Sequence, residues 1–418
     1  MKNKAVPLQE RTLYIPQMSF EGAACMAAAF RSIGVDARPS PDSDEKTLEL
    51  ARKYLSGDEC LPQAVVLGNF LKIADAADFD ADHTAFMLPT SNGPCRFGHY
   101  MPLCRKIFAD RGENVMICSP TSTNGYQDIG DEAQNLVRTG WQAVIASDCL
   151  RKIRLITRPF ELESGATDQI FIESLQELCS AIETRHITHI QRLNAIVNVL
   201  QKARDRFRAI PADYSQEKYV IGVVGEIFCR HNDFSNQDIF KLIEEYNGVV
   251  WISDIAEWVW YTNDEEEMRL IDTGKKWSFQ MLGCKIKQKV MHHDEKKITD
   301  LFKQDFVQYP EPLHVREILE RARPYLPREG SNGEMVMSMG KALWYYEQGV
   351  SGVIDISPFS CMNGIITEAV YPRVRKEHDG FPIRVFYFDG NQTSIKTDLE
   401  LFMELARQYH DNNIKVKK

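Results

Sequence analysis

The stretch Lys218–Glu226, "KYVIGVVGE", decides the fold class of this chain of 418 residues. Its interior is a nearly continuous apolar run, which is typical of a strand buried on both faces of a parallel sheet. A capped helical pattern at Ser235–Gly248 and a strand pattern at Val249–Ser253 follow it. Strands that alternate with helices indicate a parallel sheet covered by helices.

The same alternation occupies the first 120 residues, with strand patterns at Thr12–Met18, His83–Thr90 and Asn114–Pro120. Between residues 159 and 210 the signal is long and helical, without sustained heptads. We therefore predict an α/β protein with two Rossmann-like parallel-sheet domains, at 1–158 and 214–418. A helical connecting layer at 159–213 should join them, and no internal repeat is evident.

Composition excludes several classes of function. The formal net charge is −9 and the isoelectric point is near 5.7, which disfavours nucleic-acid binding because that requires clustered Lys and Arg. The short basic stretch Lys275–Lys289 is interpreted as a solvated helix face. No apolar leader and no run of about 18 apolar residues is present, so we expect a cytoplasmic protein without a membrane partner.

The chain has ten cysteines, and in a reducing compartment they are not expected to form a disulfide framework. None are spaced as Cys-x-x-Cys, so the common zinc-ribbon, thioredoxin and ferredoxin patterns are absent. A metal site would have to combine cysteines that are distant in the sequence.

Three cysteines share one context, a loop that opens a predicted helix. Cys95 and Cys361 each follow a predicted strand, and Cys60 precedes a helix whose first turn holds Pro62. The carboxyl ends of parallel strands line one crevice, and a helix N-terminus lowers a thiol's pKa. The three thiolates would suit a soft metal or an iron–sulfur cluster between the domains. The alternative, that each is a small buried apolar residue, stays open.

Cys25, Cys104 and Cys179 fall within apolar helical patterns and are expected to lie in the core, and Cys229 and Cys284 are interpreted as structural. Cys118 and Cys149 are intermediate; Cys118 ends a strand and could approach the same crevice.

Four motifs surround these positions: "GDECLP" (57–62), "GPCRFGHY" (93–100), "GEIFCRHNDFSN" (225–236) and "SPFSCMNGIITEA" (357–369). Together they resemble the 2-hydroxyacyl-CoA dehydratase and benzoyl-CoA reductase superfamily of iron–sulfur proteins. They look most like its relatives found with or fused to acyl-CoA dehydratase activases. The resemblance extends from Thr12 to about Phe402.

The resemblance implies a [4Fe–4S] cluster held by Cys60, Cys95 and Cys361. The fourth iron is either open to substrate or solvent, or bound by another ligand such as Cys118 or Glu226. A related branch carries a double-cubane [8Fe–9S] cluster, but this chain has no second set of cysteines in equally clear loops.

The resemblance also implies a separate ATP-hydrolysing activase as the electron donor. The absence of a G-x-x-x-x-G-K-[ST] motif agrees with nucleotide chemistry in a partner. The expected role is then that of a reductase or radical dehydratase component in an anaerobic cytoplasm, acting on a small molecule. An acyl-CoA substrate rests on family analogy. The alternatives are an electron-transfer or cluster-bearing partner subunit, or a structural zinc site. Dimer formation is left open.

Several polar residues are candidates for the same crevice. Glu226 ends the strand of the opening stretch and could donate a proton, accept a hydrogen bond beside the cluster or bind iron; helix capping is the alternative. Arg96 and Arg230 could stabilise negative charge, although structural ion pairing is the commoner fate of a single arginine. His99 is expected to be a solvated residue, and Asp389–Ser394 a turn at the crevice edge.

Overall fold

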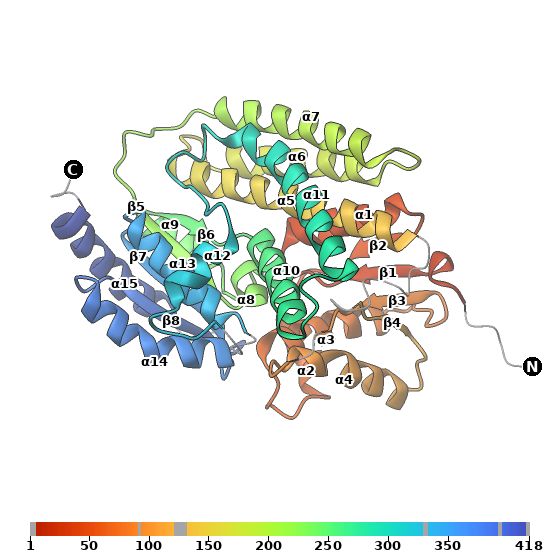
Figure 1. Cartoon of the computed structure of the whole chain (residues 1–418). Coiled ribbons are helices and arrows are strands. Elements are labelled where there is room, and N and C mark those ends of the chain that lie inside the picture. The colour runs from red at the N-terminus through yellow and green to blue at the C-terminus, as the bar shows by residue number, and fades with distance from the viewer. Residues whose placement is uncertain (1–5, 91–92, 121–131, 329–332, 392–394, 415–418) are drawn as a thin grey trace, which may run out of the picture.

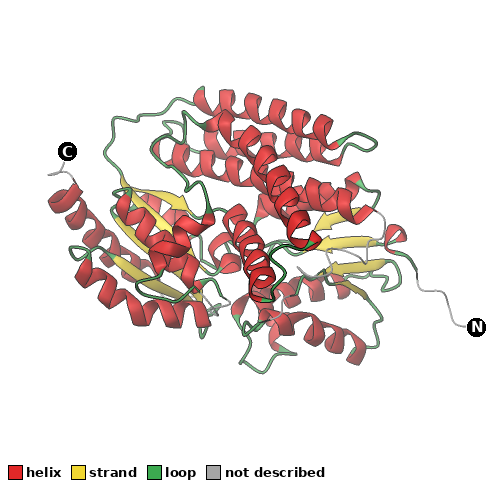
Figure 2. Ribbon diagram, in the orientation of Figure 1, coloured by secondary structure: helices red, strands yellow, loops and turns green. Residues whose placement is uncertain are grey.

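The computed structural model describes residues 6–90, 93–120, 132–328, 333–391 and 395–414. It contains two four-stranded sheets in which every strand pairing is parallel, with helices around both (Figures 1 and 2). The predicted α/β class with two parallel sheets is therefore confirmed. The strands are β1 Thr12–Ile15, β2 Asp36–Pro39, β3 Thr84–Met87, β4 Met116–Cys118, β5 Tyr219–Gly225, β6 Gly248–Ile252, β7 Gly352–Pro358 and β8 Ile383–Phe388.

The two sheets repeat one topology, although the sequence shows no repeat. The first has the order β2-β1-β3-β4 and the second the order β6-β5-β7-β8. In each sheet the second strand in sequence pairs with one side of the first strand, and the third strand pairs with the other side. The reversal falls between β1 and β3 in one sheet and between β5 and β7 in the other, and in open α/β sheets ligands bind at the carboxyl ends of the strands beside such a reversal.

Helices pack around the sheets and between them (Figure 1). Those of the first half are α1 Phe20–Ser32, α2 Glu45–Arg52, α3 Leu61–Ala74, α4 Phe97–Asp110, α5 Ala133–Thr157, α6 Ala166–Glu183 and α7 His189–Arg208. Those of the second half are α8 Ile227–His231, α9 Ile239–Glu245, α10 Ile255–Asp272, α11 Phe279–Thr299, α12 Val315–Ala322, α13 Met335–Glu347, α14 Met362–Glu377 and α15 Ile395–Tyr409.

Some element boundaries differ from the predicted ones for local reasons. Strand β1 ends at Ile15 because the next residue, Pro16, has no N–H for the ladder. Helix α9 begins at Ile239 and not near Ser235. The Asn232 side chain accepts hydrogen bonds from the backbone N–H and the hydroxyl of Ser235, and Asp238 has a left-handed backbone. Strand β2 was not predicted, since it is short and half-exposed.

Two apolar cores join the parts of the chain. One lies between the first sheet and the layer of α5, α6, α7 and α11. The other contains residues of both sheets, among them Phe86 of β3, Ile221 of β5 and Cys60 at the start of α3. The edge where the two domains meet is therefore a continuous apolar contact next to one of the candidate cysteines.

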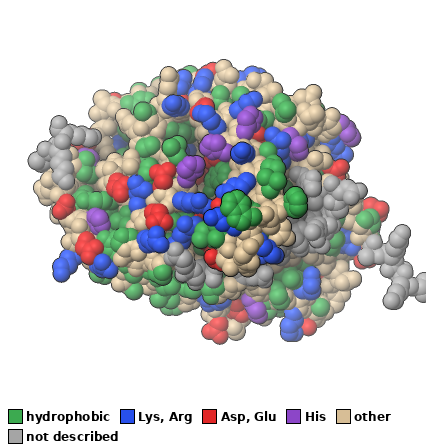
Figure 3. All heavy atoms as spheres, in the orientation of Figure 1, with side chains coloured by type: hydrophobic (Ala, Val, Ile, Leu, Met, Phe, Trp, Pro, Cys, Tyr) green, Lys and Arg blue, Asp and Glu red, His purple; other side chains and the backbone are tan. Residues whose placement is uncertain are grey.

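The surface shows no sign of a membrane-crossing helix: among the described residues, no helix is both long and apolar enough to span a bilayer. Apolar side chains do reach solvent at the start of α11, where Trp277 is 93% and Phe279 92% exposed. Figure 3 shows hydrophobic atoms beside Lys and Arg atoms near the middle of this face. The lysines of the stretch Lys275–Lys289 are exposed, as expected for a solvated helix face.

Gly225 ends β5 in a conformation that admits no side chain. Its φ is 116°, and a Cβ there would lie 2.1 Å from the carbonyl oxygen of Ile356 on β7. We expect Gly225→Ala to destabilise the protein by about 3 kcal/mol or more, from backbone strain plus overpacking. Chemical denaturation of the metal-free protein measures this.

Gly349 supplies the matched control for that variant. It also has positive φ, of 78°, but no atom lies within 4 Å of the place that a Cβ would take. Gly349→Ala should cost only the backbone strain, about 1–2 kcal/mol. Equal losses in the two variants would contradict a tight β5–β7 contact at Gly225.

Candidate functional site

Two of the three candidate cysteines stand in loops that follow strands, and the third, Cys60, lies in the loop between α2 and α3. Cys95 lies between β3 and α4, and Cys361 is the N-cap of α14 directly after β7. Because β3 and β7 hold the same place in the two sheets, Cys95 and Cys361 occupy corresponding positions. Cys60 is the N-cap of α3, with Pro62 in the first turn as predicted.

One guanidinium connects the three loops. Arg96, next to Cys95, donates from Nη1 to the carbonyl oxygen of Asp58, two residues before Cys60. From Nη2 it donates to the carbonyl oxygen of Ser360 at 2.9 Å and to its hydroxyl at 3.0 Å. Ser360 directly precedes Cys361. The backbone segments that carry all three cysteines are thus hydrogen-bonded to one side chain, across the two domains.

Ser360 has a left-handed backbone, with φ of 60°. Residues other than glycine adopt this conformation at a free-energy cost, and such residues persist only when their surroundings hold them. The two hydrogen bonds from Arg96 provide part of that restraint. The turn before Cys361 is therefore a strained element that the first domain holds in place.

Tyr100 approaches the Cys60 sulfur from the first turn of α4. Its hydroxyl oxygen lies 2.7 Å from Sγ of Cys60, and both residues are buried. The ring is fixed by an edge-to-face contact with Phe97, with centroids 5.2 Å apart. Helix α4 therefore contacts the Cys60 thiol through Tyr100, while Arg96, its N-cap, contacts the Cys361 loop.

The thiols do not have the lowered pKa values expected from helix N-termini. Desolvation is the largest cause acting on each, and the negative charge of Glu226 adds to it, so the pKa of all three is raised, that of Cys361 to about 12. Arg96 acts in the opposite direction on Cys60 and Cys95. The prediction of intrinsically stable thiolates was therefore wrong, because burial and a nearby carboxylate outweigh the favourable backbone.

Glu226 caps helix α8, which was the alternative interpretation of this residue. Its carboxylate accepts the backbone N–H of Phe228 at 3.0 Å and of Cys229 at 2.8 Å. Its charge nevertheless acts on the three candidate cysteines, so it belongs to the same site. The structure thus gives Glu226 a capping role and a place beside the thiols.

Glu334, immediately before α13, was missed by sequence analysis. Its carboxylate accepts the backbone N–H of Ile227 at 3.2 Å, so it shares the start of α8 with Glu226. Burial first, and then the Glu226 charge, raise the pKa of Glu334 to about 8. Its charge also acts on Cys95 and Cys361. Two carboxyl groups with raised pKa values therefore lie beside the thiols.

Arg230 is the buried cation of this group. It donates from Nη1 to the carbonyl oxygen of Gly225 at 3.1 Å, and its charge lowers the pKa of both Glu226 and Glu334. Its side chain therefore holds the end of β5 and places a positive charge next to the two acids.

The remaining candidates lie at or outside the edge of the site. His99 is exposed, as expected of a solvated histidine. Asp389 accepts the backbone N–H of Asn391 at 2.8 Å, which is turn chemistry; residues 392–394 of that predicted turn lie outside the described residues. Cys118 ends β4 and is buried in the first core. Cys229 is fully buried, and its pKa is raised first by burial.

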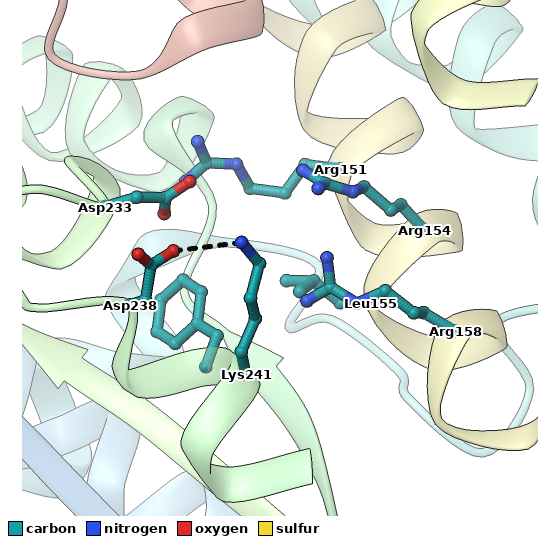
Figure 4. A pocket seen from close by; sticks show the side chains of 8 residues that line it. Arg151, Arg154, Leu155, Arg158, Asp233, Asp238 and Lys241 are labelled. Atoms are coloured by element: carbon teal, nitrogen blue, oxygen red, sulfur yellow. Dashed lines mark ion pairs between the residues drawn. The ribbon is translucent and has the colours of Figure 1, made fainter. Parts of the chain in front are cut away.

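A charged cavity lies elsewhere, between α5 and the segment around α9 (Figure 4). Its cations have carboxylate partners: Arg154 with Asp168 at 2.7 Å, Arg158 with Glu244 at 2.8 Å, and Lys241 with Asp238 at 3.3 Å. This cavity contains no candidate cysteine. Of these three pairs, Arg158–Glu244 links the end of α5 to the second domain.

The arrangement of the thiols bears on which metal group could fit. Among the described residues, no three His, Cys, Asp or Glu side chains are grouped closely enough to hold a single metal ion. A cubane differs, since each thiolate binds a separate iron at its own corner, and its ligands stand farther apart than those of one ion. In addition, the buried side-chain nitrogen of Gln63, three residues after Cys60, has no hydrogen-bond partner. A donor without an acceptor suits a site that receives sulfide or thiolate.

Comparisons with known proteins leave the family unassigned: no family model matches the chain, and no curated protein is significantly similar to it.

Sequence analysis missed two contributions to the site. Glu334 stands in the Gly-containing segment "SNGEM" before a helix, which is the context that drew attention to the cysteines and could have flagged it. The role of Arg96 as a link between loops depends on the approach of the two domains, and no local pattern indicates that.

Arg96→Lys tests the link between the loops. Lysine keeps the charge but cannot reach both Asp58 and Ser360, so we expect a loss of about 1–3 kcal/mol in the free energy of unfolding. Hydrogen exchange should become faster at the turn before Cys361. Arg105→Lys, at an exposed position of α4, is the control. Unchanged exchange in the Arg96 variant would contradict the link.

Glu334→Gln tests the charge at the start of α8. A raised pKa means that the Glu334 contribution to stability is complete below about pH 4.5 and is lost as pH rises through about 8. Glutamine still accepts the Ile227 N–H but does not ionise. The variant should therefore gain stability relative to wild type as pH increases, by roughly 1.4 kcal/mol per unit of pKa displacement.

Thermal unfolding of the metal-free protein between pH 5 and 9, a range of about four units around this pKa, measures the effect. Glu400→Gln on α15, an exposed position, is the matched control and should follow wild type throughout. A constant difference between Glu334→Gln and wild type across this range would show that Glu334 does not titrate with a raised pKa.

Proposed function

We propose that this protein is an iron–sulfur component of the 2-hydroxyacyl-CoA dehydratase type, a reductase or radical dehydratase component. Cys60, Cys95 and Cys361 would hold one [4Fe–4S] cluster between the two domains. An ATP-hydrolysing activase would donate the electron. The observation that carries the proposal is the bonding of Arg96 to the loops of Cys60 and Cys361 from its place next to Cys95.

The electrostatics of the site favour binding of a group that carries strong positive charge. Three thiols with raised pKa values, beside two carboxyl groups, are unfavourable as thiolates unless positive charge is supplied. Iron supplies such charge, and binding of a metal group releases the thiol protons. If the three cysteines were only small apolar residues of the core, nothing would require two carboxyl groups and the buried Arg230 beside them.

The chain's own residues would divide the work as follows. The cysteines fix the cluster, which when bound would supply a single low-potential electron to the substrate. Arg96 and Arg230 offset negative charge around it. Glu334, whose pKa is raised to about 8, would deliver a proton to the substrate as it gains negative charge, and Glu226, whose pKa is also raised by burial, lies beside it.

The role of Glu226 as a cap favours an open iron site over a fourth ligand from this residue. Both of its oxygens accept backbone N–H groups. If the Glu226 carboxylate turned away from the helix to bind iron, it would lose those hydrogen bonds. An open site suits an enzyme component, whereas a closed one suits an electron-transfer subunit. The proposed substrate is a small molecule, and family analogy suggests an acyl-CoA. The proposed setting is an anaerobic cytoplasm.

The experiment is anaerobic reconstitution followed by electron transfer. The wild-type protein should bind iron and sulfide and be reduced by a cognate activase only with ATP and reductant, as followed by EPR. Cys60→Ser, Cys95→Ser and Cys361→Ser should each lose or alter the cluster signal. Cys179→Ser, in the half-buried face of α6, should keep it.

Each outcome decides between the candidate functions. Absence of iron and sulfide in the reconstituted wild type would overturn the proposal. Full reduction by a mild donor, with no effect of activase or ATP, would favour an electron-transfer subunit. Zinc retained in place of iron would favour a structural site.

A further inference from the structure

The side chain of Tyr100 reaches a candidate ligand sulfur from another element of the fold. Its hydroxyl oxygen is 2.7 Å from Sγ of Cys60, which itself is only 8% exposed. The ring packs edge to face on Phe97 in the same helical turn, so the hydroxyl has little freedom to move away. The contact joins α4 to the N-cap of α3, two segments that are distant in the sequence.

The direction of this hydrogen bond depends on the state of the sulfur. In the metal-free protein, either the thiol or the phenol could be the donor. A sulfur that binds iron has no proton and can only accept. A phenol keeps its proton near neutral pH, since its ordinary pKa is near 10. With a cluster bound, the O–H of Tyr100 is therefore the donor.

We infer that Tyr100 sets the reduction potential of the cluster by donating a hydrogen bond to the Cys60 ligand, an inference that rests on the proposed function. One added electron makes the cluster and its thiolates more negative. A fixed donor at a ligand sulfur stabilises this reduced form more than the oxidised form and raises the potential. The O–H bond stays intact, and the electron comes from the activase or from a chemical titrant.

The burial of the contact strengthens the effect. A hydrogen bond in a site that excludes water is not replaced by solvent when its donor is removed. Cys95, by contrast, is exposed, and its sulfur accepts the backbone N–H of Phe97 at 3.4 Å. At the Cys60 sulfur a buried side chain adjusts the charge, whereas at Cys95 the backbone and solvent do. Tyr100 thus acts as a positioning and tuning residue.

Tyr100→Phe is the direct test, because it removes the hydroxyl and keeps the ring on Phe97. The reconstituted variant should contain as much iron as wild type, but its midpoint potential, from an EPR-monitored redox titration, should be more negative. Tyr54→Phe is the matched control, since it removes a hydroxyl of the same domain that accepts a hydrogen bond from Arg111. Its potential should equal that of wild type.

A second variant covers the case in which Tyr100→Phe fails to fold or to bind iron. 3-Fluorotyrosine at position 100 keeps the hydroxyl and makes it a stronger donor, so the midpoint potential should move to a more positive value. Equal potentials for wild type and both position-100 variants would overturn the inference while the proposed function stands. A wild-type protein that binds no cluster would instead overturn the proposed function itself.

Discussion

The hydrogen bonds of the Arg96 guanidinium hold the Cys60 and Cys361 loops next to the Cys95 loop. The two sheets alone do not fix the positions of these loops relative to one another. In a parallel sheet, every loop that follows a strand leaves from the same edge, so Cys95 and Cys361 are bound to lie at the carboxyl edges of their sheets. That rule says nothing about the distance between the edges. Arg96 closes it, through Asp58 and through a turn whose residue Ser360 is strained without support.

The charges at the site would be better balanced with a positively charged group bound there. The carboxyl groups of Glu226 and Glu334 lie at the start of α8, near the three thiols, and Arg230 and Arg96 are the cations beside them. As neutral thiols and protonated acids these groups are tolerated. Ionised together they repel. Beyond the backbone hydrogen bonds that Glu226 and Glu334 accept, ionised acidic groups placed together cost stability, and acids with perturbed pKa values gather at functional sites.

The sequence predicts those parts of the structure that depend on local pattern. The apolar run ending at Glu226 predicted a buried parallel strand, and the loop context of Cys60 predicted a helix N-cap with Pro62 in its first turn. It could not predict what depends on the approach of distant segments. Strand β2 is held by pairing with β1 and not by its own composition. The raised pKa values of the thiols come from burial between domains, which overrides the backbone effect that the sequence indicates.

The exposure of the three cysteines indicates on which side the proposed partner would dock. Cys60 is enclosed by the core that both domains share, whereas Cys95 is exposed and Cys361 half-buried. Beside Cys361, the side chain of Phe359 is 65% exposed, and Ile365 of α14 is exposed as well. Electron tunnelling favours the shortest path, and exposed apolar side chains are the kind that form the buried centre of an interface. For a cluster held as proposed, the electron would therefore enter past Cys95 and Cys361, while the buried Cys60 and Tyr100 would remain on the side shielded from solvent.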